Sequence, residues 1–192
     1  VLGDRVFVGI WLTASCCFAG LFSYISTSSL LLQETFGLRE TEFGVVFAIC
    51  SVGVFVGVQL GSRLSAHLGP QKVLIAGTAG MIVAASLLLG LDAMRSGHIP
   101  LIPAMFAYTL TFGACNPAAQ VLALQNHRKD SGVAASLMGA LNMTLAAVVG
   151  PVIGQFELAS AAPMAISMLC CAAAAALCLW LIARPRRIEF TL

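Results

Sequence analysis

Six long apolar stretches dominate this chain, and none of them contains an Asp, Glu, Lys or Arg. They cover residues 6–32, 43–62, 73–91, 99–125, 131–156 and 158–183. A bilayer core of about 30 Å is crossed by roughly 20 helical residues, and each stretch is near or above that length. A charge at the middle of the bilayer costs at least about 2.5 kcal/mol. The pattern therefore predicts six membrane spans.

Composition and periodicity exclude a soluble helical bundle. The 192-residue chain is 59% hydrophobic and 9% charged, and the stretches lack the alternating polar and apolar faces of soluble helices. Lipid cannot satisfy exposed backbone groups, so the spans must be helices or a closed barrel. The strands of a membrane barrel alternate apolar and polar residues. The run of alanines at 172–176 does not alternate in this way, which excludes a barrel. We predict an all-α membrane protein whose residues 1–192 form a single six-helix domain.

The charged residues in the loops divide unevenly between the two sides of the membrane. The richer side carries Arg5, Arg63, Lys72, Arg128, Lys129, Arg184, Arg186 and Arg187. The other side carries Arg39 and Arg95, with Glu34, Glu40, Glu42, Asp92 and Glu157. Basic loops stay in the cytoplasm, which predicts a multi-pass protein of the plasma membrane with both termini cytoplasmic. The net charge of +2 reflects this topology and does not indicate nucleic-acid binding.

Residue patterns for enzymes and metal sites are missing from the sequence. The seven cysteines, Cys16, Cys17, Cys50, Cys115, Cys170, Cys171 and Cys178, all fall inside the stretches. Cysteine is a small buried hydrophobe in such positions. His67, His98 and His127 lie singly in three different loops, whereas a zinc site needs three or four converging ligands. We expect no enzymatic activity, no metal and no cofactor.

Small residues and prolines recur at helical spacing inside three of the stretches. They are Gly53, Gly57 and Gly61 in the second, Gly113 and Pro117 in the fourth, and Gly150, Pro151 and Gly154 in the fifth. A glycine at every fourth position lets another helix approach closely. A proline inside a helix removes one backbone hydrogen bond and favours a kink. Simple packing explains both features, but Pro117, Gly150, Pro151 and Gly154 also suit a hinge that opens and closes a pathway.

Uncharged polar and aromatic side chains gather in the first, fourth and fifth stretches. Asn116, Gln120 and Asn142 cannot satisfy themselves well on their own helix, so we expect them to face another helix or a wet cavity. Phe18 and Phe22 follow one another at helical spacing. Such aromatic strips often serve packing alone. An apolar cavity with a few hydrogen-bonding groups is also what a site for lipophilic molecules requires.

Short motifs at helix ends and in loops follow one another in an order that matches a known family. They are FAGLFSY at 18–24, ETFGL at 34–38, EFG at 42–44, GSRL at 61–64, LGP at 68–70, NPA at 116–118, LAL at 122–124, HR at 127–128, SGVAASLMG at 131–139, PM at 163–164 and ARPRR at 183–187. Together they resemble the carboxy-terminal half of major facilitator superfamily transporters. Within that superfamily they are most similar to the Bcr/CflA group of drug:proton antiporters, named for resistance to bicyclomycin and chloramphenicol.

The resemblance implies one half of a twelve-helix protein in which two six-helix halves enclose a substrate site near the middle of the membrane. Two departures favour the second half. The loop at 66–72 lacks the acid of the family's signature, and the stretch at 99–125 lacks the membrane-embedded arginine expected in the first half. The segment at 150–154 is similar to the glycine–proline signature of antiporters and would be its symmetry-related counterpart. The chain begins at Val1 rather than at a methionine, so we expect an amino-terminal half to precede it.

The function implied by the resemblance is outward drug transport by alternating access, coupled to inward proton flow. Proton coupling uses a carboxylate inside the membrane, so the titrating acid would belong to the other half. The substrate-binding candidates in this half are Phe18, Phe22, Tyr24, Tyr108, Asn116 and Asn142. Arg63 and Lys72 would help to hold the cytoplasmic gate or its lipid contacts. The implied partners are the lipid bilayer, a small lipophilic substrate, and protons carried by the other half.

Two other hypotheses are compatible with the sequence. It could be a complete six-helix protein that pairs with a second copy through the face of Gly53, Gly57 and Gly61 to form a pore or carrier. It could also be an inactive truncated fragment. Within transporters, the substrate could be a sugar, a metabolite or a siderophore instead of a drug.

Overall fold

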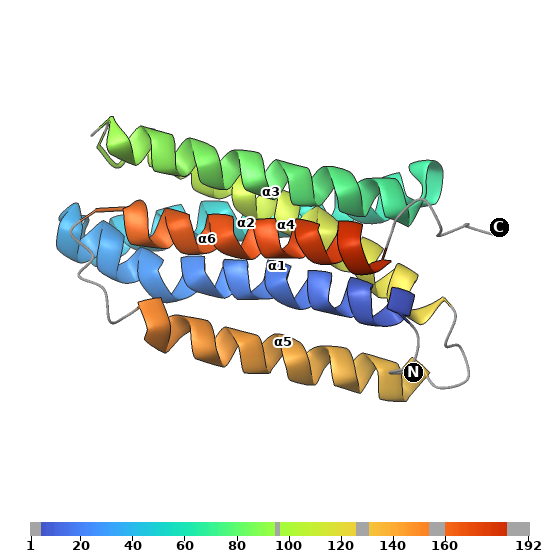
Figure 1. The fold of residues 1–192 in the computed structure, drawn as a ribbon. Coiled ribbons are helices and arrows are strands. Elements are labelled where there is room, and N and C mark those ends of the chain that lie inside the picture. The colour runs from blue at the N-terminus through green and yellow to red at the C-terminus, as the bar shows by residue number, and fades with distance from the viewer. Residues whose placement is uncertain (1–4, 95–96, 126–130, 154–159, 184–192) are drawn as a thin grey trace.

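The described part of the chain is a bundle of long helices and contains no strand. The computed structural model describes residues 5–94, 97–125, 131–153 and 160–183. Its elements are α1 (Arg5–Ser29) with a π-helical continuation η1 (Leu30–Thr35), α2 (Glu40–Leu68), α3 (Pro70–Ala93), α4 (Leu101–Leu124), α5 (Ser131–Ile153), and α6 (Ala162–Cys178) with a π-helical end η3 (Leu179–Ala183). The helices run alongside one another in one elongated bundle (Figure 1).

Five of these helices are long and apolar enough to cross a membrane, which confirms a multi-pass membrane protein. They are Arg5–Thr35, Glu40–Leu68, Pro70–Ala93, Ser131–Pro151 and Ala162–Ala183. The predicted span at 99–125 corresponds to α4, which has 24 residues but is not among the five. Asn116, Pro117 and Gln120 interrupt the apolar residues of α4. It packs against α2, α3 and α1, so much of its surface is covered by other helices and does not meet lipid.

The structure extends the second helix beyond its predicted end at residue 62. Helix α2 continues to Leu68, and Arg63 and His67 lie exposed on its last turns. Long basic side chains can cover apolar surface while their charged ends reach water, so a charge ends an apolar run earlier than it ends a helix. The turn into α3 is made at Gly69, whose φ of 88° suits glycine, and Pro70 occupies the first turn of α3.

The repeated glycines of α2 form a close crossing with α4. A Cβ on Gly57 would overlap the carbonyl of Leu110, and one on Gly113 would overlap the carbonyl of Val54. Gly53 and Gly61 likewise lie against residues of α4. Small residues allow such contact between backbones. The expectation that this face joins a second copy of the chain is therefore wrong, because α4 already covers it.

On the other side of α4, helix α1 packs against α5 and α6. Ser23 of α1 and Ser167 of α6 share a hydrogen bond of 2.8 Å. The Oδ1 of Asp92, at the end of α3, accepts a hydrogen bond of 2.9 Å from the backbone N–H of Ala161, just before α6. Helix α5 packs mainly against α1 and lies at the edge of the bundle (Figure 1). It is thus the least enclosed helix of the described chain.

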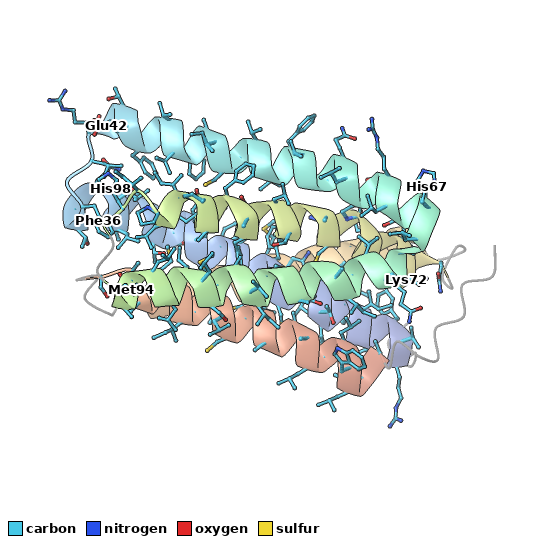
Figure 2. The ribbon with its side chains drawn as sticks, turned by 90° about the horizontal axis from the view of Figure 1, so that it is seen from above. Phe36, Glu42, His67, Lys72, Met94 and His98 are labelled. Atoms are coloured by element: carbon cyan, nitrogen blue, oxygen red, sulfur yellow. The ribbon has the colours of Figure 1, made fainter. Side chains whose placement is uncertain are left out.

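The two ends of the bundle carry different side chains. Figure 2 shows Phe36, Glu42, Met94 and His98 at one end, and His67 and Lys72 at the other. The rings of Phe36 and His98 lie 5.9 Å apart, so the segments before α2 and before α4 meet. The placement of these two groups of residues at opposite ends of the bundle agrees with the alternation of loops that the sequence predicts.

Candidate functional site

A cavity of about 180 Å³ opens between α1, α4 and α5. Its lining residues are Ala14, Cys17 and Phe18 of α1, Leu74 of α3, Phe112, Cys115, Asn116, Ala119, Gln120 and Leu124 of α4, and Ala135, Met138, Gly139 and Asn142 of α5. Residues three and four positions apart share one helix face, and each of the three helices contributes such a set. The cavity therefore lies along three continuous helix faces.

The small residues of α5 help to leave this space open. Ala135 and Gly139 occupy successive turns of the face that lines the cavity, and both are exposed. Helix α5 contacts α4 only sparsely, because its main partner is α1. The α4 and α5 walls are consequently not packed tightly together.

Three carboxamide groups, those of Asn116, Gln120 and Asn142, give the cavity its hydrogen-bonding capacity. The Nε2 of Gln120 donates to the Oδ1 of Asn116 at 2.9 Å, and the hydroxyl of Ser15 donates to the Oδ1 of Asn142 at 2.7 Å. Each carboxamide has two donor hydrogens and one acceptor oxygen. The NH₂ groups of Asn116 and Asn142 and the side-chain oxygen of Gln120 are therefore available to a ligand.

The charge and size of the cavity limit what it can bind. None of the described residues that line it is acidic or basic. An uncharged wall of aromatic rings, Met138 and carboxamides suits an uncharged ligand that carries a few polar groups. Sites for drug-sized molecules usually enclose about 300–1,000 Å³. At about 180 Å³, this cavity has the size of one part of such a site.

Three of the six predicted substrate-binding residues meet at the cavity. Phe18, Asn116 and Asn142 all line it, from three different helices. Phe22 is half-buried one turn from Phe18, with the two ring centroids 5.2 Å apart, but does not line the cavity. Phe18 also faces Phe112, whose ring centroid is 6.1 Å away. The aromatic strip is thus joined to the cavity through Phe18.

The two predicted tyrosines lie in helix packing. Tyr24 is buried and stacks on Phe47 of α2, with the ring centroids 6.2 Å apart. Tyr108 is fully buried, and its hydroxyl donates to the carbonyl of Met168 at 3.5 Å. Gly20 leaves room for that hydroxyl, since a Cβ there would overlap it. A binding role for either tyrosine remains a prediction.

The predicted gating residues are spread over the bundle. Pro117 is half-buried inside a continuous α4, directly beside Asn116 of the cavity. Gly150 lies near Ser26 of α1, Pro151 is exposed near the end of α5, and Gly154 lies outside the described residues. A hinge at any of these positions remains a prediction.

The predicted cytoplasmic residues lie apart from the cavity. Arg63 on the last turns of α2 and Lys72 on the first turn of α3 are both exposed. Neither is among the residues that line the cavity. Their expected part in a gate remains a prediction.

Several lining residues were not predicted as site residues. Gln120 follows Asn116 by one helical turn, and that spacing could have identified it. Phe112 and Met138 resemble any other apolar residue of a span. Cys17 and Cys115 are equally compatible with packing, so only the arrangement of α1 and α4 reveals that both reach the same cavity.

Comparison with known proteins identifies the family. Residues 1–151 match the model of the Major Facilitator Superfamily. The chain is similar to an uncharacterized MFS-type transporter, YdgK, of Bacillus subtilis, with 26% identity over 88% of this chain and 42% of the relative. It is also similar to a bicyclomycin resistance protein homolog of Haemophilus influenzae, with 23% identity over 85% of this chain and 41% of the relative.

The chain belongs to the Major Facilitator Superfamily. This assignment confirms the family that the sequence motifs indicate, and it points to transport rather than to enzymatic activity. The chain spans less than half the length of the two curated relatives that it matches.

Proposed function

We propose that this chain forms the carboxy-terminal half of a Bcr/CflA-type drug:proton antiporter, which exports small lipophilic molecules by alternating access. The observation that carries the proposal is the uncharged cavity between α1, α4 and α5. The similarity to a bicyclomycin resistance protein homolog supports the drug-exporting group. The coverage of less than half of each relative supports a half of a longer transporter.

Each wall of the cavity has a separate part in substrate binding. Phe18, Phe112 and Met138 remove apolar parts of the substrate from water, and burial contributes about 25 cal/mol for each Å². Asn116 and Asn142 hydrogen-bond to polar groups and set the orientation of the substrate. A hydroxyl-rich sugar would need more hydrogen-bonding partners than the three carboxamides supply, so the lining favours lipophilic substrates.

Proton coupling in this proposal requires a group outside the described cavity. The acidic residues of the described chain, such as Glu40, Glu42 and Asp92, lie near helix ends. A proton-coupling carboxylate works inside the membrane, where protonation removes the cost of its charge. The coupling acid therefore belongs to the other half, while this half contributes a neutral wall whose binding does not itself depend on pH.

The protein would lie in the plasma membrane of a bacterium, with the junction of α2 and α3 in the cytoplasm. Arg63, His67 and Lys72 gather at that junction, and acidic residues gather at the opposite end of the bundle. The excess of basic residues in cytoplasmic loops supports this orientation. Both relatives come from bacteria.

The test is drug export by the intact transporter carrying Asn116→Ala or Asn142→Ala. Loss of one hydrogen bond of about 1 kcal/mol lowers substrate affinity roughly fivefold, so we expect a higher KM for export and reduced drug resistance. Ser136→Ala and Thr144→Ala are matched controls on α5, because both hydroxyls bond to carbonyls of their own helix and neither lines the cavity. Wild-type resistance and KM in both cavity variants would reject this cavity as the substrate site.

A further inference from the structure

Two thiols meet at the wall of the cavity. Cys17 of α1 and Cys115 of α4 both line it, although each side chain is only 2% exposed. The two side chains reach this cavity from different helices, and their thiols lie near one another. Two thiols held together beside an open cavity form a site that one bridging ligand can occupy.

A glycine of a third helix makes room for one of the thiols. The sulfur of Cys115 packs against Gly77 of α3, where a Cβ would overlap it. The position of the Cys115 sulfur therefore depends on the absence of a Cβ at residue 77. The pair is preorganised, which lowers the entropic cost of bridging it.

We propose that Cys17 and Cys115 form a dithiol site that binds trivalent organoarsenicals. Thiolates are soft ligands, and trivalent arsenic is a soft centre that binds two of them. An organoarsenic oxide, R–As=O, reacts with two thiols to give R–As(SCys)₂ and water. Two As–S bonds form and the As=O bond breaks, and both thiol protons leave with the oxygen as water. The oxidation state of arsenic does not change.

The charge balance of this reaction suits the cavity. The arsenical, the two thiols and the product are all neutral, so no charge is buried in an apolar site. A hard divalent cation would need further ligands, and the described residues that line the cavity supply no carboxylate or imidazole. Binding that releases no proton also predicts an affinity independent of pH between about 6 and 8.

A second thiol pair must be separated from the first in any test. Cys16 of α1 and Cys178 of α6 also interact, but neither lines the cavity. Cys170 and Cys171 are neighbours in sequence. Side chains at adjacent positions on a helix point about 100° apart, so these two thiols are less well placed to bind one arsenic atom together. A Cys16→Ser, Cys178→Ser background removes the competing pair and keeps the cavity pair intact.

The experiment is titration of the intact purified protein in lipid nanodiscs with phenylarsine oxide, followed by mass spectrometry. In the Cys16→Ser, Cys178→Ser background we expect one phenylarsenic group per chain, cross-linking the peptides that contain Cys17 and Cys115. Cys115→Ser should raise the half-saturating concentration roughly 100-fold or more, because one-point attachment loses the second bond. Cys50→Ser removes a buried cysteine of α2 outside the cavity lining and should change nothing.

A second variant keeps both thiols and tests their placement. Gly77→Ala displaces Cys115 without removing any sulfur and should weaken binding several-fold while leaving the number of thiols unchanged. An adduct that maps to Cys170 and Cys171, or binding that survives Cys115→Ser at full strength, would overturn the proposal. Because binding is measured directly, a failed result leaves the proposed export function untouched, and loss of export leaves this site untouched.

Discussion

The hydroxyl of Ser15 on α1 donates a hydrogen bond of 2.7 Å to the Oδ1 of Asn142 on α5. Helix α5 packs mainly against α1, so this bond joins the least enclosed helix of the bundle to its chief neighbour. Asn142 also lines the cavity. The position of α5 and the shape of the cavity are consequently coupled through one pair of side chains.

A double-mutant cycle on this pair measures the coupling. Hydrogen bonds between membrane helices contribute about 0.6 kcal/mol on average and at most about 1.7 kcal/mol. We expect Ser15→Ala and Asn142→Ala to show a coupling energy in that range when the free energy of unfolding is measured in bicelles. The same cycle on Thr144, which bonds within its own helix to Ala140, paired with Ser15 should give no coupling. Equal coupling in both cycles would show that the Ser15 bond has no specific effect.

The α2–α4 crossing predicts opposite effects for two glycines of the same helix. Gly57→Ala forces a Cβ against the carbonyl of Leu110, and overpacking of this kind costs about 1–3 kcal/mol. A Cβ at residue 44 would have no other atom within 4 Å. Gly44→Ala should therefore stabilise the helix by about 0.5–1 kcal/mol, the usual difference between glycine and alanine inside a helix. The free energy of unfolding should fall for the first variant and rise for the second. A rise for both would mean that the close crossing does not exist.

The carboxylate of Asp92 predicts a stability difference between two substitutions. Its Oδ1 accepts a bond of 2.9 Å from the N–H of Ala161 and so joins the end of α3 to the start of α6. Asp92→Ala leaves that N–H without its acceptor and should lower the free energy of unfolding by about 1 kcal/mol. Asp92→Asn keeps an oxygen in the same place and should lose clearly less. Equal losses would mean that the negative charge matters and the hydrogen bond does not.

The sequence predicted the helices more completely than their contacts. Charge-free apolar length is a local property, so it located the spans, although α2 continues past Arg63 because a charge at a helix end reaches water. The spacing of Gly53, Gly57 and Gly61 predicted a close approach. Which helix approaches is decided by tertiary packing, and the answer is α4 instead of a second copy.

The candidate site was predictable from two carboxamides that need hydrogen-bonding partners and from Phe18 of the aromatic strip. Asn116 and Asn142 were predicted because a buried carboxamide needs hydrogen bonds, and both line the cavity. Tyr108 was also predicted to bind substrate, but its hydroxyl donates to the backbone of α6. Cys17 and Cys115 have no such requirement, so no sequence pattern distinguishes a thiol that lines a cavity from one that fills space.

Opposite ends of α2 provide a test of the proposed orientation. Glu40 and His67 are both exposed, one on the first turn and the other on the last. In intact cells, we expect a membrane-impermeant maleimide to label Glu40→Cys, while His67→Cys reacts only after the membrane is permeabilised. The unsubstituted protein serves as the control, because its cysteines in the described helices lie within the spans. Labelling of His67→Cys in intact cells would reverse the orientation.

Pro117 provides the sharpest test of a hinge in α4, because a second proline of the same helix is its control. Pro117 has no N–H for the carbonyl of Gly113, four residues earlier, so Pro117→Ala restores a hydrogen bond and should stabilise the fold by up to about 3 kcal/mol. Pro103 lies in the first turn, where an N–H has no partner within the helix, so Pro103→Ala should change stability little.

If α4 bends at Pro117 during alternating access, the stiffer helix should slow export by the intact transporter although the protein has become more stable. In the proposed function the substrate contacts Asn116, one residue away from Pro117, so KM and kcat must be measured separately to distinguish hinge stiffness from a displaced carboxamide. A lower kcat at an unchanged KM is the expected result. If Pro117→Ala exports as fast as Pro103→Ala, the proline serves packing alone and the pathway opens elsewhere.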